Sequence, residues 1–202
     1  MILNLYGKIL IAGFVIIGSV VLYSCSCSCT DSESNVPDPV LKNSNEFVIS
    51  KVGKDFFDKN IKPDFQETKK IGSNYYMVYS FKMPDKPYVD TKIKFTVDTT
   101  GQITDKENIA GLPDCISNLG KCSFNIDEEQ AKKIALDNDF KEGIKDWKVE
   151  FKWEPKYKQY VWSILSTFEE SQGSFGFRGN GEILLIDPDS GEIISQDKWR
   201  VM

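Results

Sequence analysis

The chain contains two similar segments, each of which predicts a strand, a tight turn and a second strand. Residues 182–194 read EILLIDPDSGEII, and residues 92–104 read KIKFTVDTTGQIT. In both, an apolar run leads to an Asp, and a Gly closes the turn, as tight turns favour. A chain with this pattern twice is expected to form at least two antiparallel strand pairs. Chance similarity between two generic hairpins is the alternative interpretation, because any tight turn recruits Asp and Gly.

The similarity extends upstream of the turns with a constant offset of 83 residues, which grows to 89 and 90 at the turns. The matching positions are Phe57 and Phe140, Ile61 and Ile144, Lys62 and Lys145, Val78–Ser80 and Val161–Ser163, Asp98 and Asp187, and Gly101 and Gly191. An insertion between residues 163 and 186 and one extra turn residue account for the drift. The pattern predicts an α+β fold of two tandem units, each with one helix packed on a small antiparallel sheet.

The second copy has the clearer secondary-structure signals. Asp127 to Gln130 has the form of a capping box and predicts a helix from about Glu128 to Asn138. Apolar, aromatic-rich runs at residues 147–153 and 160–168 predict strands. Alternation places one set of side chains on the core face of the first strand, namely Trp147, Val149, Phe151 and Trp153.

Most of the aromatic residues are expected in the core, and two are candidates for an exposed binding role. Tyr157 lies in a predicted hairpin and Trp199 near the end of the chain. Exposed aromatic rings of this kind can anchor a peptide or a glycan.

Two acidic segments could be read as functional sites, but the spacing of their residues does not support that interpretation. The turn from Asp187 to Glu192 begins like a calcium-binding loop, but its Gly is fifth rather than sixth, so a hairpin turn is predicted. Glu169 and Glu170 are adjacent in a Ser- and Gly-rich stretch and are expected in solvent. No metal site, cofactor site or catalytic residue is predicted.

The segment between the two copies contains Cys115 and Cys122 in a C-x6-C spacing. In an oxidising compartment, a short loop of this kind predicts a structural disulfide. Two free, buried thiols are the alternative.

The N-terminus has the proportions of a secretory signal. An uncharged apolar run of fourteen residues, 9–22, is shorter than the about 20 residues that a spanning helix needs. The residues before Cys25 resemble a bacterial lipobox, which implies lipidation at Cys25; an uncleaved N-terminal anchor is the alternative. Residues 26–45 are rich in Ser, Asp, Asn and Pro and predict a flexible tether. Cys27 and Cys29 have no evident role.

The composition excludes several function classes. The sequence has no histidine, so histidine-dependent nucleophiles and general bases are excluded. Its net charge is −5 with both signs interspersed, which argues against a nucleic-acid surface.

The segments FNIDEEQAKKIAL, DWKVEF, YVWSIL and LLIDPDSGEII resemble a PepSY domain in their order and spacing. The match covers about residues 124–199, and the first half resembles the family only through the internal repeat. The resemblance implies a small α+β module that binds or restrains a peptidase or another envelope protein without catalysis. The family's signature residues are structural: Ala131 and Ala135 in the helix, and Asp187 and Gly191 in the last turn.

These observations predict a signal peptide (1–24), a lipidated Cys25 with a tether (25–45), an N-terminal PepSY-like unit (46–108), a disulfide-bonded linker (109–125) and a C-terminal PepSY domain (126–202). The expected function is that of a non-enzymatic binding module, lipid-anchored to a membrane of the bacterial envelope on its extracytoplasmic side. Its expected partner is an extracytoplasmic protease or envelope protein. The alternative is a structural lipoprotein, or one that binds a glycan or small ligand.

Overall fold

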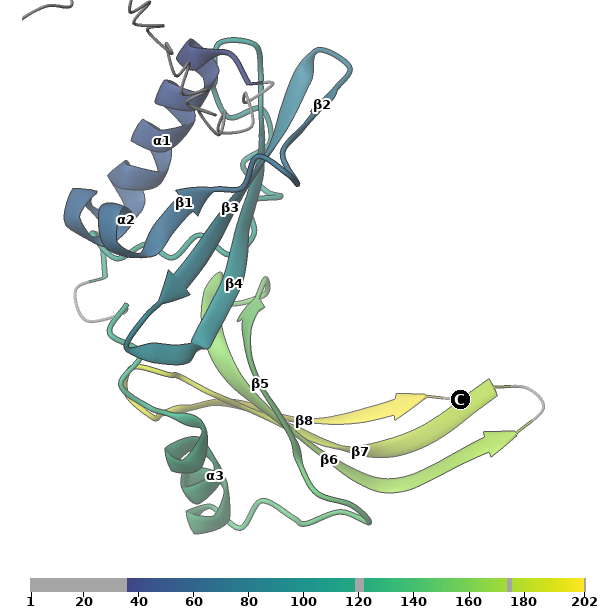
Figure 1. The fold of residues 1–202 in the computed structure, drawn as a ribbon. Coiled ribbons are helices and arrows are strands. Elements are labelled where there is room, and N and C mark those ends of the chain that lie inside the picture. Colours follow the sequence, from purple (N-terminus) through teal and green to yellow (C-terminus); the bar gives the residue numbers. More distant parts are fainter. Residues whose placement is uncertain (1–35, 119–121, 174–175, 202) are drawn as a thin grey trace, which may run out of the picture. The chain divides into compact units, whose positions relative to one another are not determined.

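The structure, a computed structural model, describes residues 36–118, 122–173 and 176–201 (Figure 1). It is α+β, with three helices and two four-stranded antiparallel sheets among these residues. The predicted fold class is therefore confirmed at this level. The predicted signal peptide, Cys25, Cys27 and Cys29 lie outside the described residues. No described helix has the length and apolar character needed to cross a bilayer.

The first sheet is preceded by two helices, where the sequence pattern predicted one. Helix α1 spans Asp38–Val52 and α2 spans Lys54–Asn60, with Gly53 between them at φ 88°. The prediction of a tether up to residue 45 is wrong from Asp38 onward. One face of α1 lies in the core. It consists of every fourth residue, namely Val40, Ser44, Val48 and Val52. Because Ser44 is polar, the apolar residues of this face do not recur at a regular helical spacing in the sequence, and the helix was not predicted there.

The first sheet is built around strand β3 (Asn74–Met83). Strand β4 (Lys86–Val97) pairs along one side of β3, while the short strands β1 (Ile61–Pro63) and β2 (Lys69–Ile71) pair along the other. The face toward α1 carries fully buried aromatic side chains, and Tyr79 stacks on Phe95 with ring centroids 5.6 Å apart.

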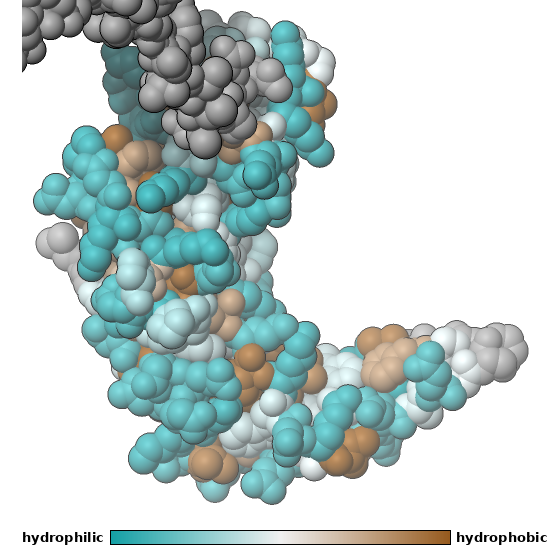
Figure 2. Space-filling model, viewed as in Figure 1, coloured by the Kyte–Doolittle hydropathy of each residue, from teal (hydrophilic) through white to brown (hydrophobic). Residues whose placement is uncertain are grey.

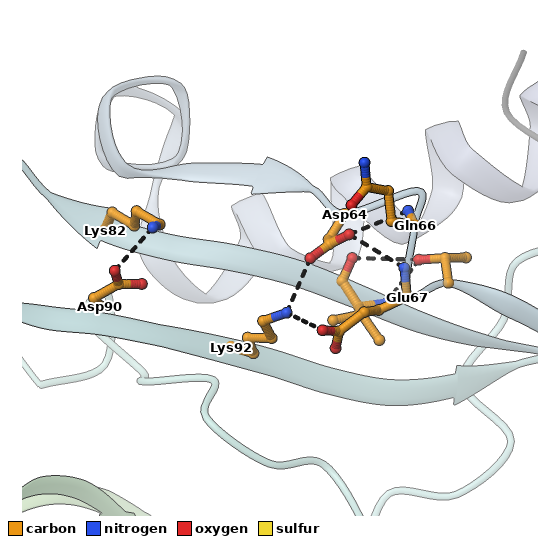
Figure 3. A network of polar contacts seen from close by, with 8 residues as sticks. Asp64, Gln66, Glu67, Lys82, Asp90 and Lys92 are labelled. Carbon is orange, nitrogen blue, oxygen red and sulfur yellow. Dashed lines mark hydrogen bonds and ion pairs between the residues drawn. The ribbon is translucent and has the colours of Figure 1, made fainter. Parts of the chain in front are cut away.

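The connection between β1 and β2 is fastened to β4 by a polar network (Figure 3). Lys92 on β4 donates to Asp64 at 3.1 Å and also pairs with Glu67. Burial favours a higher pKa for the Asp64 carboxyl, but hydrogen bonds from Lys92 and from backbone amides outweigh it and lower that pKa. The network therefore fastens the β1–β2 connection to β4, across the intervening strand β3.

The second sheet is a meander in the order β5 (Lys148–Glu154), β6 (Gln159–Gly173), β7 (Gly176–Ile186) and β8 (Ile193–Val201). Helix α3 (Glu128–Asp137) packs its buried Ala131 and Ala135 on one face of this sheet. The predicted capping box is present, because Asp127 and Gln130 exchange hydrogen bonds between side chains and backbone amides. The predicted alternation in β5 is also confirmed, since Trp147, Val149 and Phe151 pack into the core around Trp162.

Strands β6 and β7 run past α3 toward their connecting turn (Figure 1). A bulge between Thr167 and Glu169 separates the buried part of β6 from residues 169–173, which are exposed. A β-bulge of this kind bends the strand and increases its twist locally.

In both turns noted in the sequence, the glycine amide donates to the carbonyl of the aspartate that opens the turn, across three residues in the first turn and four in the second. Gly101 donates to the Asp98 carbonyl at 3.0 Å, and Gly191 donates to the Asp187 carbonyl at 2.9 Å. Both glycines have positive φ, 83° and 76°, a region that favours glycine. The strands that follow differ, because Ile103 forms one isolated bridge to Val97 whereas β8 pairs along β7.

Candidate functional site

The linker after the first turn runs along β4 before it reaches the second sheet. Ala110 exchanges two backbone hydrogen bonds with Lys94, both 2.9 Å long. The next residue, Gly111, has φ 74° and accepts a hydrogen bond from the Tyr160 hydroxyl at 2.8 Å. A side chain at Gly111 would collide with the Lys92 carbonyl. Tyr160 belongs to β6, so this bond ties the linker to the second sheet.

A disulfide between Cys115 and Cys122 closes the next part of the linker, as the sequence predicts. The same loop is tied to the end of α1, because Lys51 pairs with Asp114 at 2.8 Å and the Ile116 amide donates to the Lys51 carbonyl at 3.0 Å. The hydrogen bond from Lys51 is the main reason that the pKa of Asp114 is lowered.

The acidic turn between β7 and β8 holds the end of the linker, a role that the sequence did not indicate. One oxygen of the Asp189 carboxylate accepts hydrogen bonds from the amides of Ser123 and Phe124, at 2.8 and 2.6 Å. The neighbouring Pro188 carbonyl accepts from the Ile126 amide at 2.9 Å. The turn is therefore a hairpin that also fastens the linker to the second sheet.

Phe124 connects the cores of the two sheets. It has φ 44° and is 1% exposed, and its ring lies against Phe81 of the first sheet and Tyr160 of the second. Its carbonyl accepts from the Tyr88 hydroxyl at 2.6 Å. Tyr160 stacks on Phe151 with centroids 5.0 Å apart, and burial raises the pKa of the Tyr160 hydroxyl. The aromatic side chains thus form a continuous packed group.

A cavity of about 500 Å³, here called the junction cavity, opens beside this aromatic group. Its lining comes from α1, the linker, the β5–β6 hairpin and the β7–β8 turn. The aromatic lining residues are Phe47, Phe124, Trp153, Tyr157 and Tyr160, and the charged ones are Lys51, Lys106, Glu107, Asp114, Lys158, Asp187 and Asp189. Cavities of this size commonly bind small molecules or single protein side chains.

Two half-buried aromatic residues offer ring surface to the junction cavity. Trp153 is the last aromatic residue of β5, and its ring lies 5.3 Å from that of Tyr160. Tyr157 follows in the β5–β6 hairpin, with the Lys156 ammonium 4.9 Å from its ring centre. A hydrogen bond with Lys156 lowers the pKa of the Tyr157 hydroxyl. This arrangement suits binding by aromatic packing.

The two predicted binding aromatics do not form one site. Tyr157 lines the junction cavity, whereas Trp199 is absent from its lining and lies on β8 opposite Gly181. The Trp199 Nε1 donates to the Ser166 carbonyl at 3.0 Å, and its ring covers Gly179 and Gly181. The remaining lining residues were missed because they lie up to about 140 positions apart in the sequence. The only sequence feature that indicated this site was the concentration of aromatic residues around the β5–β6 hairpin.

Among the described residues, no group of three or more Cys, Asp or Glu side chains is placed to hold a metal ion. Comparison with protein-family models, with curated protein sequences and with solved structures finds no match to this chain.

Proposed function

We propose that the chain is a lipid-anchored, extracytoplasmic binding module without catalytic activity, which holds a partner protein at the junction cavity. The observation that carries the proposal is the position of Trp153 and Tyr157. Both rings are half-buried and line a cavity whose walls come from α1, the linker and the second sheet. Aromatic side chains in such positions are frequent anchors of protein binding.

The walls of the junction cavity are fixed before any partner binds. The Cys115–Cys122 disulfide closes a loop within the linker. The Asp189 hydrogen bonds and the bond from Tyr160 to Gly111 hold the linker to the second sheet. A preformed site loses less conformational entropy on binding, so more of the contact energy contributes to affinity.

The polarity of the surface favours binding of the partner through a few anchor side chains rather than through a broad apolar interface. On the face drawn in Figure 2, hydrophilic residues dominate and apolar residues form only small, scattered patches. The cavity lining carries charges of both signs, and the Lys51 and Asp114 pair neutralises one of each. An apolar or aromatic side chain on an uncharged segment of the partner fits this lining best.

The location, family and partner class in this proposal come from the sequence. The leader and Cys25 support a lipid anchor outside the cytoplasm, and the absence of histidine supports a non-enzymatic role. The resemblance to PepSY domains supports two units and a secreted peptidase or envelope protein as the partner. The Asp98 and Asp187 turns each contain a hydrogen bond from Gly to Asp and differ in length by one residue, which is consistent with a duplication.

Site-specific photo-crosslinking in native membranes tests the proposal. The photoreactive residue benzoylphenylalanine replaces Tyr157 in one chain and Tyr76 in a control chain. Tyr76 is a matched control, because it is also half-buried with a lysine over its ring, Lys69 at 5.8 Å, but does not line the cavity. We expect one extracytoplasmic protein to be captured at position 157 and not at position 76. Capture of the same proteins from both positions would contradict the proposal.

The peptidase part has its own test. If the captured protein is a peptidase, adding one equivalent of the purified chain should lower its activity, and Tyr157→Ala should weaken that effect. Equimolar binding without any change in activity would refute restraint of a peptidase.

A second candidate function is the binding of a glycan or small apolar ligand in the junction cavity. The volume of about 500 Å³ favours it, because it lies within the range of small-molecule sites. This function predicts that Trp153→Ala and Tyr157→Ala each abolish ligand binding and leave every protease unaffected.

A further inference from the structure

The chain has only two arginines among its 25 basic residues, and both lie at the outer end of the second sheet. Arg178 is on β7 and Arg200 is on β8. The strand register pairs Arg200 with Asn180, and Asn180 lies two residues from Arg178 on the same strand. Since residues two apart on a strand share a face, both guanidinium groups lie on the same face of the sheet.

The two arginines line one open hollow of about 570 Å³, here called the arginine hollow. Its other polar lining residues are Glu169, Glu170, Ser171 and Asn180. It shares no lining residue with the junction cavity. It is therefore a separate place on the molecule, and its test is independent of the proposed function.

The neighbouring carboxylates are engaged by other side chains. Glu169 accepts a hydrogen bond from the Asn180 amide at 2.7 Å, and Glu170 pairs with Lys145. Within the part of the chain that the structure describes, neither Arg178 nor Arg200 forms an ion pair or a side-chain hydrogen bond. Both exposed guanidinium groups are consequently available to a ligand.

The side chains of the arginine hollow fit a ligand that carries both an acidic group and hydroxyl groups. A guanidinium presents a planar fork of N–H donors that matches a carboxylate or a phosphate. The carboxylates of Glu169 and Glu170 would repel a simple anion, but they can accept hydrogen bonds from hydroxyl groups, as can Ser171 and Asn180. We propose that the arginine hollow binds an anionic saccharide, whose acidic group pairs with the arginines and whose hydroxyls contact the surrounding acceptors.

Calorimetric titration of the full-length chain, in a non-ionic detergent without a sugar headgroup, tests this proposal. Three hexasaccharides serve as probes: hexagalacturonate carries carboxylates, phosphorylated maltohexaose carries phosphate, and maltohexaose is the neutral control. Inorganic phosphate tests for a simple anion site. We expect binding of at least one acidic hexasaccharide, weaker at high salt, with no binding of maltohexaose and no competition by equimolar phosphate.

Single substitutions locate the binding. Arg178→Gln and Arg200→Gln should each weaken the binding of the acidic saccharide about 10- to 100-fold. Arg178→Lys should also weaken it, because lysine keeps the charge but loses the planar fork. Lys62→Gln is the matched control, since it removes one exposed positive charge from β1 in the first sheet.

Each outcome decides the proposal. Binding of hexagalacturonate or of phosphorylated maltohexaose that is lost in the arginine variants supports it and identifies the acidic group. Equal binding of maltohexaose, equal competition by inorganic phosphate, unchanged binding in both arginine variants, or no binding of either acidic probe would overturn it. Because the arginines are exposed, thermal melting of the variants should match that of the unchanged chain.

Discussion

The Asp189 carboxylate accepts a hydrogen bond from the Phe124 amide at 2.6 Å, across 65 positions of the sequence. The same oxygen accepts from the Ser123 amide at 2.8 Å. The turn that ends β7 therefore fixes the chain just before α3, at the residue whose ring joins the two cores.

Replacement of Asp189 by Asn should lower the free energy of unfolding by about 1.5–3 kcal/mol, because a charged acceptor for two amides is lost. Urea denaturation followed by tryptophan fluorescence measures this change. Asp197→Asn is the matched control, since it removes an exposed carboxylate from the neighbouring strand β8. Equal effects of the two substitutions would show that the Asp189 hydrogen bonds do not stabilise the fold.

Removal of the disulfide should destabilise the protein through the unfolded state. In the loop-entropy model, a closed loop of this length contributes about 2.5 kcal/mol. The paired substitution Cys115→Ser and Cys122→Ser should therefore lower the urea midpoint. Addition of a reductant should produce the same decrease in the unchanged chain and none in the double variant; a reductant effect in the variant would point to another disulfide.

Replacement of Gly111 by Ala should destabilise the fold more than replacement of Gly72 by Ala. Both glycines have positive φ, 74° and 61°, which costs about 1–2 kcal/mol for a residue with a side chain. Only at Gly111 does the added methyl group also collide with backbone, at the Lys92 carbonyl, while Gly72 has open space around it. Thermal melting of the two variants compares the costs, and equal shifts would contradict the close approach of the linker to β4.

Between pH 2 and pH 8, stability should depend on pH only in the acid part of the range. The pKa values of Asp64 and Asp114 are lowered in the folded protein from the ordinary 3.8, so both carboxylates stabilise the fold when ionised. Their contribution is complete above the unfolded-state pKa and is lost as pH falls through the lower, folded-state pKa. No histidine is present to titrate near neutrality, so stability should stay level from pH 6 to pH 8.

The variant Asp114→Asn isolates one of these contributions. Its difference in unfolding free energy from the unchanged chain should be largest above about pH 5 and should shrink toward pH 2. Urea denaturation at a series of pH values measures the difference. A difference that stays constant across this range would show that ionisation of Asp114 does not stabilise the fold.

Local features of the sequence were enough to predict much of the second half. The capping box at Asp127, the alternation of Val149 and Phe151 in β5, and the glycine of the last turn each depend on neighbours within a few residues. Such short-range preferences are encoded in spacing alone. The Cys115–Cys122 disulfide was predictable for the same reason, since its partners are seven positions apart.

Only the tertiary structure determined how these elements are joined and where a ligand can bind. Helix α1 begins at Asp38 and buries Val40 and Ser44, although Ser44 breaks the apolar pattern that would indicate a helix. Asp189 and Tyr160 reach linker groups 65 and 49 positions away. Local sequence spacing does not specify such partners, because they depend on how complete elements pack. The junction cavity and the arginine hollow arise in the same way, from residues that packing and strand register bring together.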